Sequence, residues 1–102
     1  MKNPALDEFA QTDYLRDGHP ELLDQVRPAF DQLIASLRVL PEQSGREERL
    51  APFAEALAAI NEWGDEIETE ERETILGAIY DLGEIVGLDR DSEFAEAWRG
   101  DW

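Results

Sequence analysis

The sequence contains no cysteine, a single histidine and a single lysine among its 102 residues. Without cysteine the chain can form no disulfide framework, offers no thiolate nucleophile and cannot bind zinc or an iron–sulfur cluster through sulfur. The lone histidine, His19, excludes a di-iron centre of the helical-bundle type, because that centre needs two Glu-x-x-His motifs. The absence of cysteine makes a cytoplasmic location the simplest expectation.

Long apolar runs are also missing. No segment approaches the roughly 18 apolar residues that a membrane-spanning helix needs. The first eight residues hold no apolar stretch suited to a signal peptide. The sequence therefore predicts a soluble protein with no membrane partner.

Positive charge is scarce. Nine lysine and arginine residues stand against 25 aspartate and glutamate residues, which gives a formal net charge of −16. Fifteen of the acids lie in residues 52–102, where Arg72, Arg90 and Arg99 are the only cations. Such a negative field repels nucleic acid and anionic lipid and attracts a basic protein surface. We therefore expect a basic protein as the partner, and neither nucleic acid nor membrane.

Regular helical spacing is what the sequence does contain. Apolar residues make up 42% of the chain and recur three or four positions apart, without the sustained alternation that strands show. The length allows one domain with one core. We predict a single all-α domain over residues 1–102, folded as a compact bundle of four to five helices.

The first long helix should open at His19-Pro20 and end near Leu40-Pro41, because proline suits the first helical turn and cannot continue a helix. Pro28 lies inside this pattern and predicts either a kink or a new helix start near Arg27. A shorter amphipathic helix is expected before it, carrying Leu6, Phe9, Ala10 and Tyr14 and ending by Asp17-Gly18.

A second long helix follows the apolar residues from Leu50 to Ile60 and should stop at Gly64. The third should take Thr69 as its N-cap and end at Gly87, and its wide apolar arc predicts the most buried helix of the bundle. Two glycines inside it, Gly77 and Gly83, lower helix stability, and we expect close packing against each to offset that cost.

A short final helix is expected after Gly87, capped by Asp89 or Asp91. Phe94, Ala97 and Trp98 should form its inner face. The other two tryptophans, Trp63 and Trp102, fit either a contact with a partner or the fastening of a chain segment to the core.

The densest acidic stretch runs from Glu62 to Glu73 and holds seven carboxylates and one arginine. Carboxylates in the first turn of the third helix are explained by the positive end of the helix dipole. Asp65, Glu66 and Glu68 lie ahead of that turn, where mutual repulsion costs stability. A solvated surface and a functional patch both remain open, and the predicted partner-binding residues are Trp63, Asp65, Glu66, Glu68, Glu70 and Glu71.

No catalytic, cofactor or metal site can be assembled from the sequence. His19 has no nucleophile near it and is expected to be a surface turn residue. Asp89–Glu93 begins like a calcium loop, but Phe94 and Gly100 stand where that loop needs glycine and glutamate. We expect no enzymatic activity, no cofactor and no bound metal.

Two segments resemble a family of small bacterial proteins of unknown function. They are Glu66-Ile67-Glu68-Thr69-Glu70-Glu71-Arg72-Glu73 and the terminal Arg99-Gly100-Asp101-Trp102. The resemblance covers mainly residues 53–102 and implies a small helical bacterial protein. It implies no activity and no catalytic residue.

Three hypotheses about function follow. The leading one is a non-enzymatic binding module, namely a bacterial immunity protein or antitoxin that neutralises a cationic toxin; small acidic bacterial domains often serve in this way. A nucleic-acid-mimicking regulator would need carboxylates spaced like phosphates over a longer surface. A homo-oligomeric or accessory protein would carry its acids for solubility alone.

Overall fold

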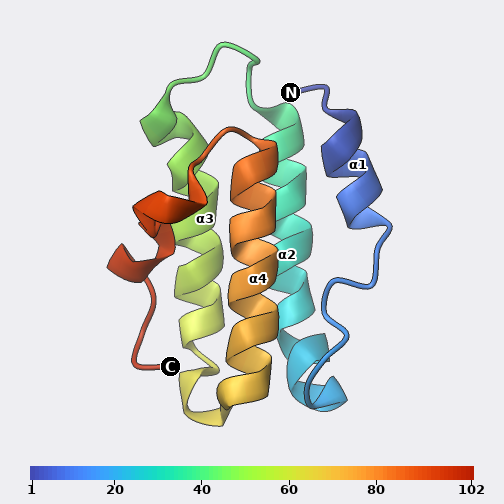
Figure 1. The fold of residues 1–102 in the computed structure, drawn as a ribbon, viewed down its shortest axis with the longest axis vertical. Helices are drawn as coiled ribbons and strands as arrows, with labels where there is room; N and C mark the ends of the chain where they lie inside the picture. Colours follow the sequence, from blue (N-terminus) through green and yellow to red (C-terminus); the bar gives the residue numbers. More distant parts are fainter.

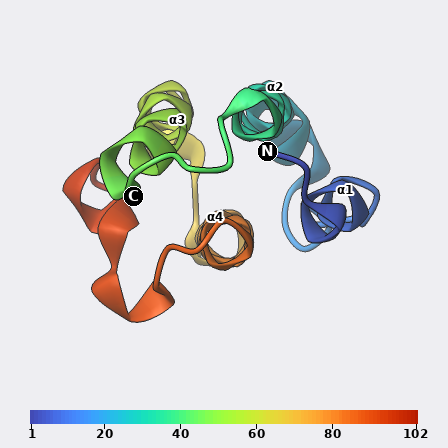
Figure 2. The same cartoon turned by 90° about the horizontal axis from the view of Figure 1, so that it is seen from above.

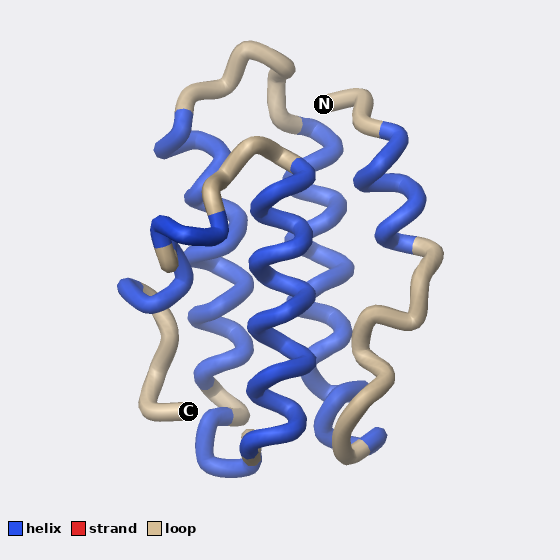
Figure 3. Tube along the Cα trace, viewed as in Figure 1, coloured by secondary structure: helices blue, strands red, loops and turns tan.

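Three long helices run up, down and up to form the body of the protein (Figure 1). The computed structural model describes all of residues 1–102 and contains helices and loops but no strands (Figure 3). The predicted all-α bundle is confirmed. The α-helices are α1 (Pro4–Ala10), α2 (Pro20–Val39), α3 (Arg46–Asn61) and α4 (Thr69–Ile85), and the short 3-10 helices are η1 (Gly64–Glu66), η2 (Arg90–Ser92) and η3 (Phe94–Ala97).

Seen along the helix axes, α2 and α3 lie side by side, and α4 runs alongside this pair and shares its core (Figure 2). Helix α1 covers one side of this trio, and η2 and η3 cover the other. The buried side chains form one continuous core. Ile75, Ile79 and Leu82 of α4 are fully buried, as its apolar arc predicted. The expectation that α4 is the most buried helix is not confirmed, because six of its 17 residues are buried, against seven of 20 in α2 and six of 16 in α3.

Helix α2 begins at Pro20 and ends one residue before Leu40, as predicted. It continues through Pro28, so no new helix starts there. Pro28 has no backbone N–H and cannot bond to the preceding turn, and the first turns of α2 lie off the axis of the rest (Figure 1).

Helix α3 stops at Asn61, three residues before the predicted end. Gly64 instead opens η1, in which Glu66 N–H donates to the Trp63 carbonyl at 2.9 Å. The prediction for the next N-cap was also one residue late: Glu68 is the cap of α4 and Thr69 is the first helical residue. The cause is Glu71, whose side chain accepts a hydrogen bond from Glu68 N–H at 3.2 Å.

Helix α4 ends at a left-handed glycine, as predicted, with Gly87 at φ +87°. The N–H of Leu88 returns to the Gly83 carbonyl at 2.8 Å, which closes the last turn. Arg49 of α3 donates to the Val86 carbonyl at 2.8 Å and satisfies another open acceptor of this helix end.

The two glycines inside α4 have different surroundings. A Cβ on Gly83 would lie 2.7 Å from the Phe94 ring, so the predicted close packing is confirmed there. A Cβ on Gly77 would meet nothing within 4 Å, so close packing is the wrong explanation for that residue.

The final helix differs from the prediction. Two 3-10 turns replace it, because Glu93 between them has the left-handed value φ 49°. Asp89 caps the first turn by accepting from Asp91 N–H at 2.9 Å. Phe94 is buried as expected, whereas Ala97 is exposed and Trp98 is only half-buried. At the other end of the chain, α1 stops at Ala10, so it does not reach Tyr14 and ends well before the predicted limit at Asp17-Gly18.

Replacing Leu82 by alanine should lower the free energy of unfolding by about 2–5 kcal/mol, because the fully buried side chain leaves a cavity between α4 and its neighbours. Gly77→Ala on the same helix is the control and should raise stability by about 0.5–1 kcal/mol, since its methyl group enters open space. Urea denaturation measures both. A loss below about 1 kcal/mol for Leu82→Ala would contradict the central position of α4.

Candidate functional site

An acidic cleft of about 630 Å³ opens at the end of the bundle where α2 and α4 begin. The first turn of α2 forms one wall, and η1 with the first turn of α4 forms the other. The cleft is lined by Gly18, His19, Glu21, Leu22, Gln25, Trp63, Glu66, Glu68, Glu70 and Glu71.

Five of the six residues that the sequence predicted as a partner-binding patch line this cleft, and Asp65 lies outside it on the exposed side of η1. The α2 wall, including Glu21 and Gln25, was not predicted. These residues lie more than 35 positions away in the sequence, and no local pattern relates them to the acidic stretch. Only the packing of α2 beside α4 brings the two walls together.

No lysine or arginine lines the cleft, although five of its residues are glutamates. Elsewhere the acids are partly neutralised within the chain, by ion pairs on the flanks of the bundle. These pairs are Arg16–Asp17, Arg27–Asp24, Arg38–Asp7, Arg90–Asp81, Arg90–Glu84 and Arg99–Glu96. None involves a glutamate of the cleft, so the negative field remains uncompensated in this concave region.

Glu71 differs from the other cleft glutamates because it is buried, with 7% of its surface exposed. Its Oε2 accepts from the N–H of His19 at 3.0 Å, and its Oε1 accepts from the N–H of Glu68 at 3.2 Å. These N–H groups belong to the N-caps of α2 and α4, so one carboxylate joins the starts of both helices. The prediction of Glu71 as a surface contact is therefore corrected: this side chain holds the two walls of the cleft together.

The sequence did carry a signal for this burial. Glu71, Ile75 and Ile79 are spaced four residues apart, which places all three on one face of α4. Because that face points into the core, the spacing alone indicates a buried carboxylate.

Gly18 makes room for the Glu71 side chain. Its φ of +137° is a conformation that glycine adopts at little cost, and a Cβ there would lie 2.8 Å from Glu71 Oε2. A second bond fastens the same loop to α4, because the Thr74 hydroxyl donates to the Asp17 carbonyl. His19 follows as the exposed N-cap of α2, which confirms its prediction as a surface turn residue.

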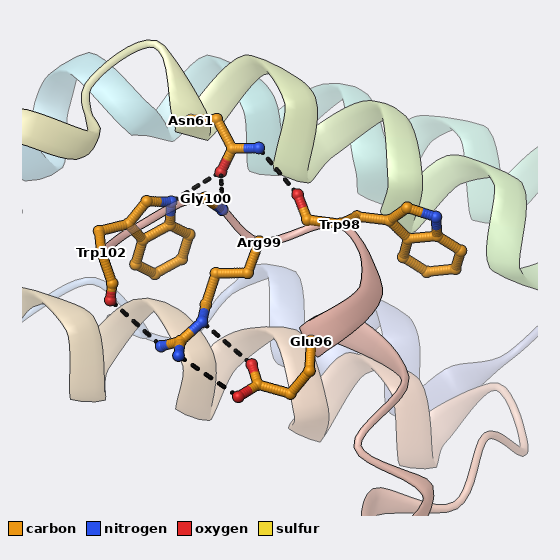
Figure 4. A network of polar contacts seen from close by, with 6 residues as sticks. All are labelled: Asn61, Glu96, Trp98, Arg99, Gly100 and Trp102. Carbon is orange, nitrogen blue, oxygen red and sulfur yellow. Dashed lines mark hydrogen bonds and ion pairs between the residues drawn. The ribbon is translucent and has the colours of Figure 1, made fainter.

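The three tryptophans have different environments. Trp63 is half-buried: it packs against the core and also lines the cleft, where it and Leu22 are the apolar residues. Trp102 is 5% exposed and donates from its indole N–H to the Asn61 side chain at 2.7 Å (Figure 4). Of the two readings left open for Trp102, the fastening of a chain segment is the one observed.

The chemistry available in the cleft is the binding of a cation. Carboxylates that lack an internal partner accept charge-assisted hydrogen bonds from guanidinium or ammonium groups. No group of three or more His, Asp or Glu side chains is arranged to hold a metal ion. Burial raises the pKa of the Tyr14 and Tyr80 hydroxyls, with smaller contributions from Asp31 and Glu96 respectively, so both stay protonated at neutral pH. Neither tyrosine lines the cleft.

No protein family, no curated protein and no solved structure matches this chain. The resemblance to a bacterial family of unknown function therefore stays a prediction. None of the helices combines the length and the apolar character that crossing a bilayer requires.

Glu71→Ala should lower the free energy of unfolding by about 1–3 kcal/mol, because it leaves the N–H groups of His19 and Glu68 without their acceptor. The matched control is Glu70→Ala, one residue away and exposed, which should change stability by less than about 0.5 kcal/mol. Thermal and urea unfolding of the two variants make the comparison. Equal effects would show that the joint between α2 and α4 does not depend on this carboxylate.

Proposed function

We propose that the protein is a non-enzymatic binding module whose acidic cleft receives basic side chains of a partner protein. The observation that carries this proposal is the cleft itself: five glutamates line one concave region that contains no lysine or arginine. Four of them, Glu21, Glu66, Glu68 and Glu70, are exposed and free to meet a partner. Concave surfaces of one charge focus the field and speed the approach of an oppositely charged protein.

Trp63 supplies the second part of the binding mechanism. Arginine stacks on the face of an aromatic ring while its guanidinium donates to carboxylates, so a tryptophan beside unpaired glutamates suits an arginine-bearing partner. In this proposal the glutamates steer the approach, and Trp63 holds the docked side chain. Glu71 takes no part in contact and keeps the two walls in place.

The narrower proposal is a bacterial immunity protein or antitoxin that resides in the cytoplasm and neutralises a cationic toxin. A toxin that acts on nucleic acid presents a basic substrate-binding surface, and a concave acidic surface is complementary to it. The class of partner rests on analogy with other small acidic bacterial domains.

The two alternative functions fit the geometry less well. A nucleic-acid mimic needs carboxylates at regular intervals along an extended surface, whereas the glutamates of the cleft are grouped in one concave region. A homo-oligomer would bring two chains of net charge −16 together, and Val39 is the one large apolar side chain that is prominently exposed. Neither arrangement makes use of the cleft.

Replacing Glu66, Glu68 and Glu70 together by lysine should slow association with a basic partner at least about tenfold, because charges at the rim of an interface act mainly on the on-rate. The control reverses Glu42, Glu47 and Glu55, which are equally exposed but lie outside the cleft. Both variants have the same net charge. Partners are captured from bacterial lysate at low salt, and surface plasmon resonance then gives the rates. If both triple variants slow association equally, the partner is attracted by the total negative charge of the protein, and the cleft has no special role.

Trp63→Ala should speed dissociation of the same complex about tenfold or more while association stays close to that of the unmutated protein. Trp63→Phe keeps an aromatic face in the cleft and should recover most of the residence time. Because Trp63 also packs against the core, circular dichroism must first show that both variants are folded. Unchanged dissociation in a folded Trp63→Ala variant would remove the tryptophan from the binding mechanism.

A further inference from the structure

The last five residues, Trp98–Trp102, form a strap that runs beside α3 to the end of the bundle that carries the cleft (Figure 1). Asn61, the last residue of α3, holds this strap with both polar atoms of its side chain (Figure 4). Its Oδ1 accepts from Gly100 N–H at 2.8 Å and from the Trp102 indole N–H at 2.7 Å. Its Nδ2 donates to the Trp98 carbonyl at 2.8 Å.

Arg99 fixes the strap a second time. Its guanidinium lies 5.5 Å from the centre of the Trp102 ring and donates to the Trp102 carbonyl at 3.2 Å (Figure 4). The same group pairs with Glu96 of η3 at 3.0 Å. The Trp102 ring is thereby held in one orientation.

The ring held in this way packs on the turn that carries one wall of the cleft. A Cβ on Gly64 would lie 3.2 Å from Trp102 Cδ1, so the indole rests directly on the first residue of η1. Trp63 and Glu66, which flank that contact, both line the cleft. Since η1 has no buried residue of its own, the Trp102 ring adds to the packing that its two caps, Trp63 and Ile67, make against the core.

We propose that Trp102, locked by Asn61, is the positioning residue of the acidic cleft, so that docking of the strap and binding of a basic ligand in the cleft favour each other. The coupling rests on the proposed function. When the strap detaches, η1 loses its support, and Trp63 and Glu66 no longer keep their places opposite α2. By thermodynamic reciprocity, a ligand that needs this arrangement also holds the strap down.

The first test measures local opening without any ligand. Asn61→Ala removes all three hydrogen bonds to the strap and leaves every glutamate of the cleft intact. Hydrogen exchange of the η1 amides, Glu66 and Ile67, should become about tenfold faster than global destabilisation alone explains. Val86→Ala is the control, because it weakens the core at the opposite end of α4. In this variant the η1 amides should exchange no faster than the loss of global stability explains.

The second test measures binding of a hexa-arginine peptide by isothermal titration calorimetry. Asn61→Ala should weaken the affinity at least about fivefold, and Val86→Ala should leave it unchanged. Equal affinity of Asn61→Ala and the unmutated protein would overturn the coupling and leave the proposed function standing. If the unmutated protein does not bind the peptide, the proposed function fails, and the coupling fails with it. Unchanged exchange of the η1 amides in Asn61→Ala would overturn the positioning role whatever the affinities.

A third test perturbs only the contact between Gly64 and the Trp102 ring. Gly64→Ala deletes no hydrogen bond but pushes a methyl group against the Trp102 ring, whereas Gly77→Ala adds the same group in open space. Gly64→Ala should speed exchange at Glu66 and weaken peptide binding, and it should do neither in a Trp102→Ala background. Additive effects of the two substitutions would show that the ring does not support the turn.

Discussion

The buried carboxylate of Glu71 is the interaction on which both the fold and the cleft depend. It lies where α2 and α4 begin, and it accepts one backbone N–H from the N-cap of each helix. Helix N-termini carry partial positive charge, so two of them together accommodate a negative group that the core could not otherwise tolerate. The loop before α2 adapts to it through Gly18, whose missing side chain leaves room for the carboxylate. The walls of the cleft are fixed because this joint is fixed.

The positions of the few arginines decide which of the other acidic residues have an ion-pair partner. Ion pairs between exposed side chains contribute little to stability. They do decide where the negative field is cancelled, and five arginines cancel it along the flanks of the bundle. None of these arginines lines the cleft. The cleft therefore groups five glutamates in one concave region that has no cation among its lining residues.

Much of the fold could be predicted from the sequence because its signals are local. Pro20 and Gly87 mark helix ends through their own backbone preferences, and apolar spacing identifies the three long helices. Contacts between distant segments have no such signal. Nothing near Asn61 indicates that its side chain meets Trp102, and nothing in the first turn of α2 relates it to the acidic stretch. The acidic residues of the patch were found by charge density, which does not distinguish an exposed carboxylate from a buried one, so Glu71 was assigned to the surface.

The amino terminus lies at the opposite end of the bundle from the cleft, where the Met1 ammonium donates to the carbonyls of Arg38 and Leu40 at the end of α2 (Figure 1). The only lysine, Lys2, is exposed beside it. Reagents that modify lysine therefore have one target among these 102 residues, at the end of the bundle away from the cleft. Attached to a surface through Lys2, the protein would present its cleft outward in a single orientation.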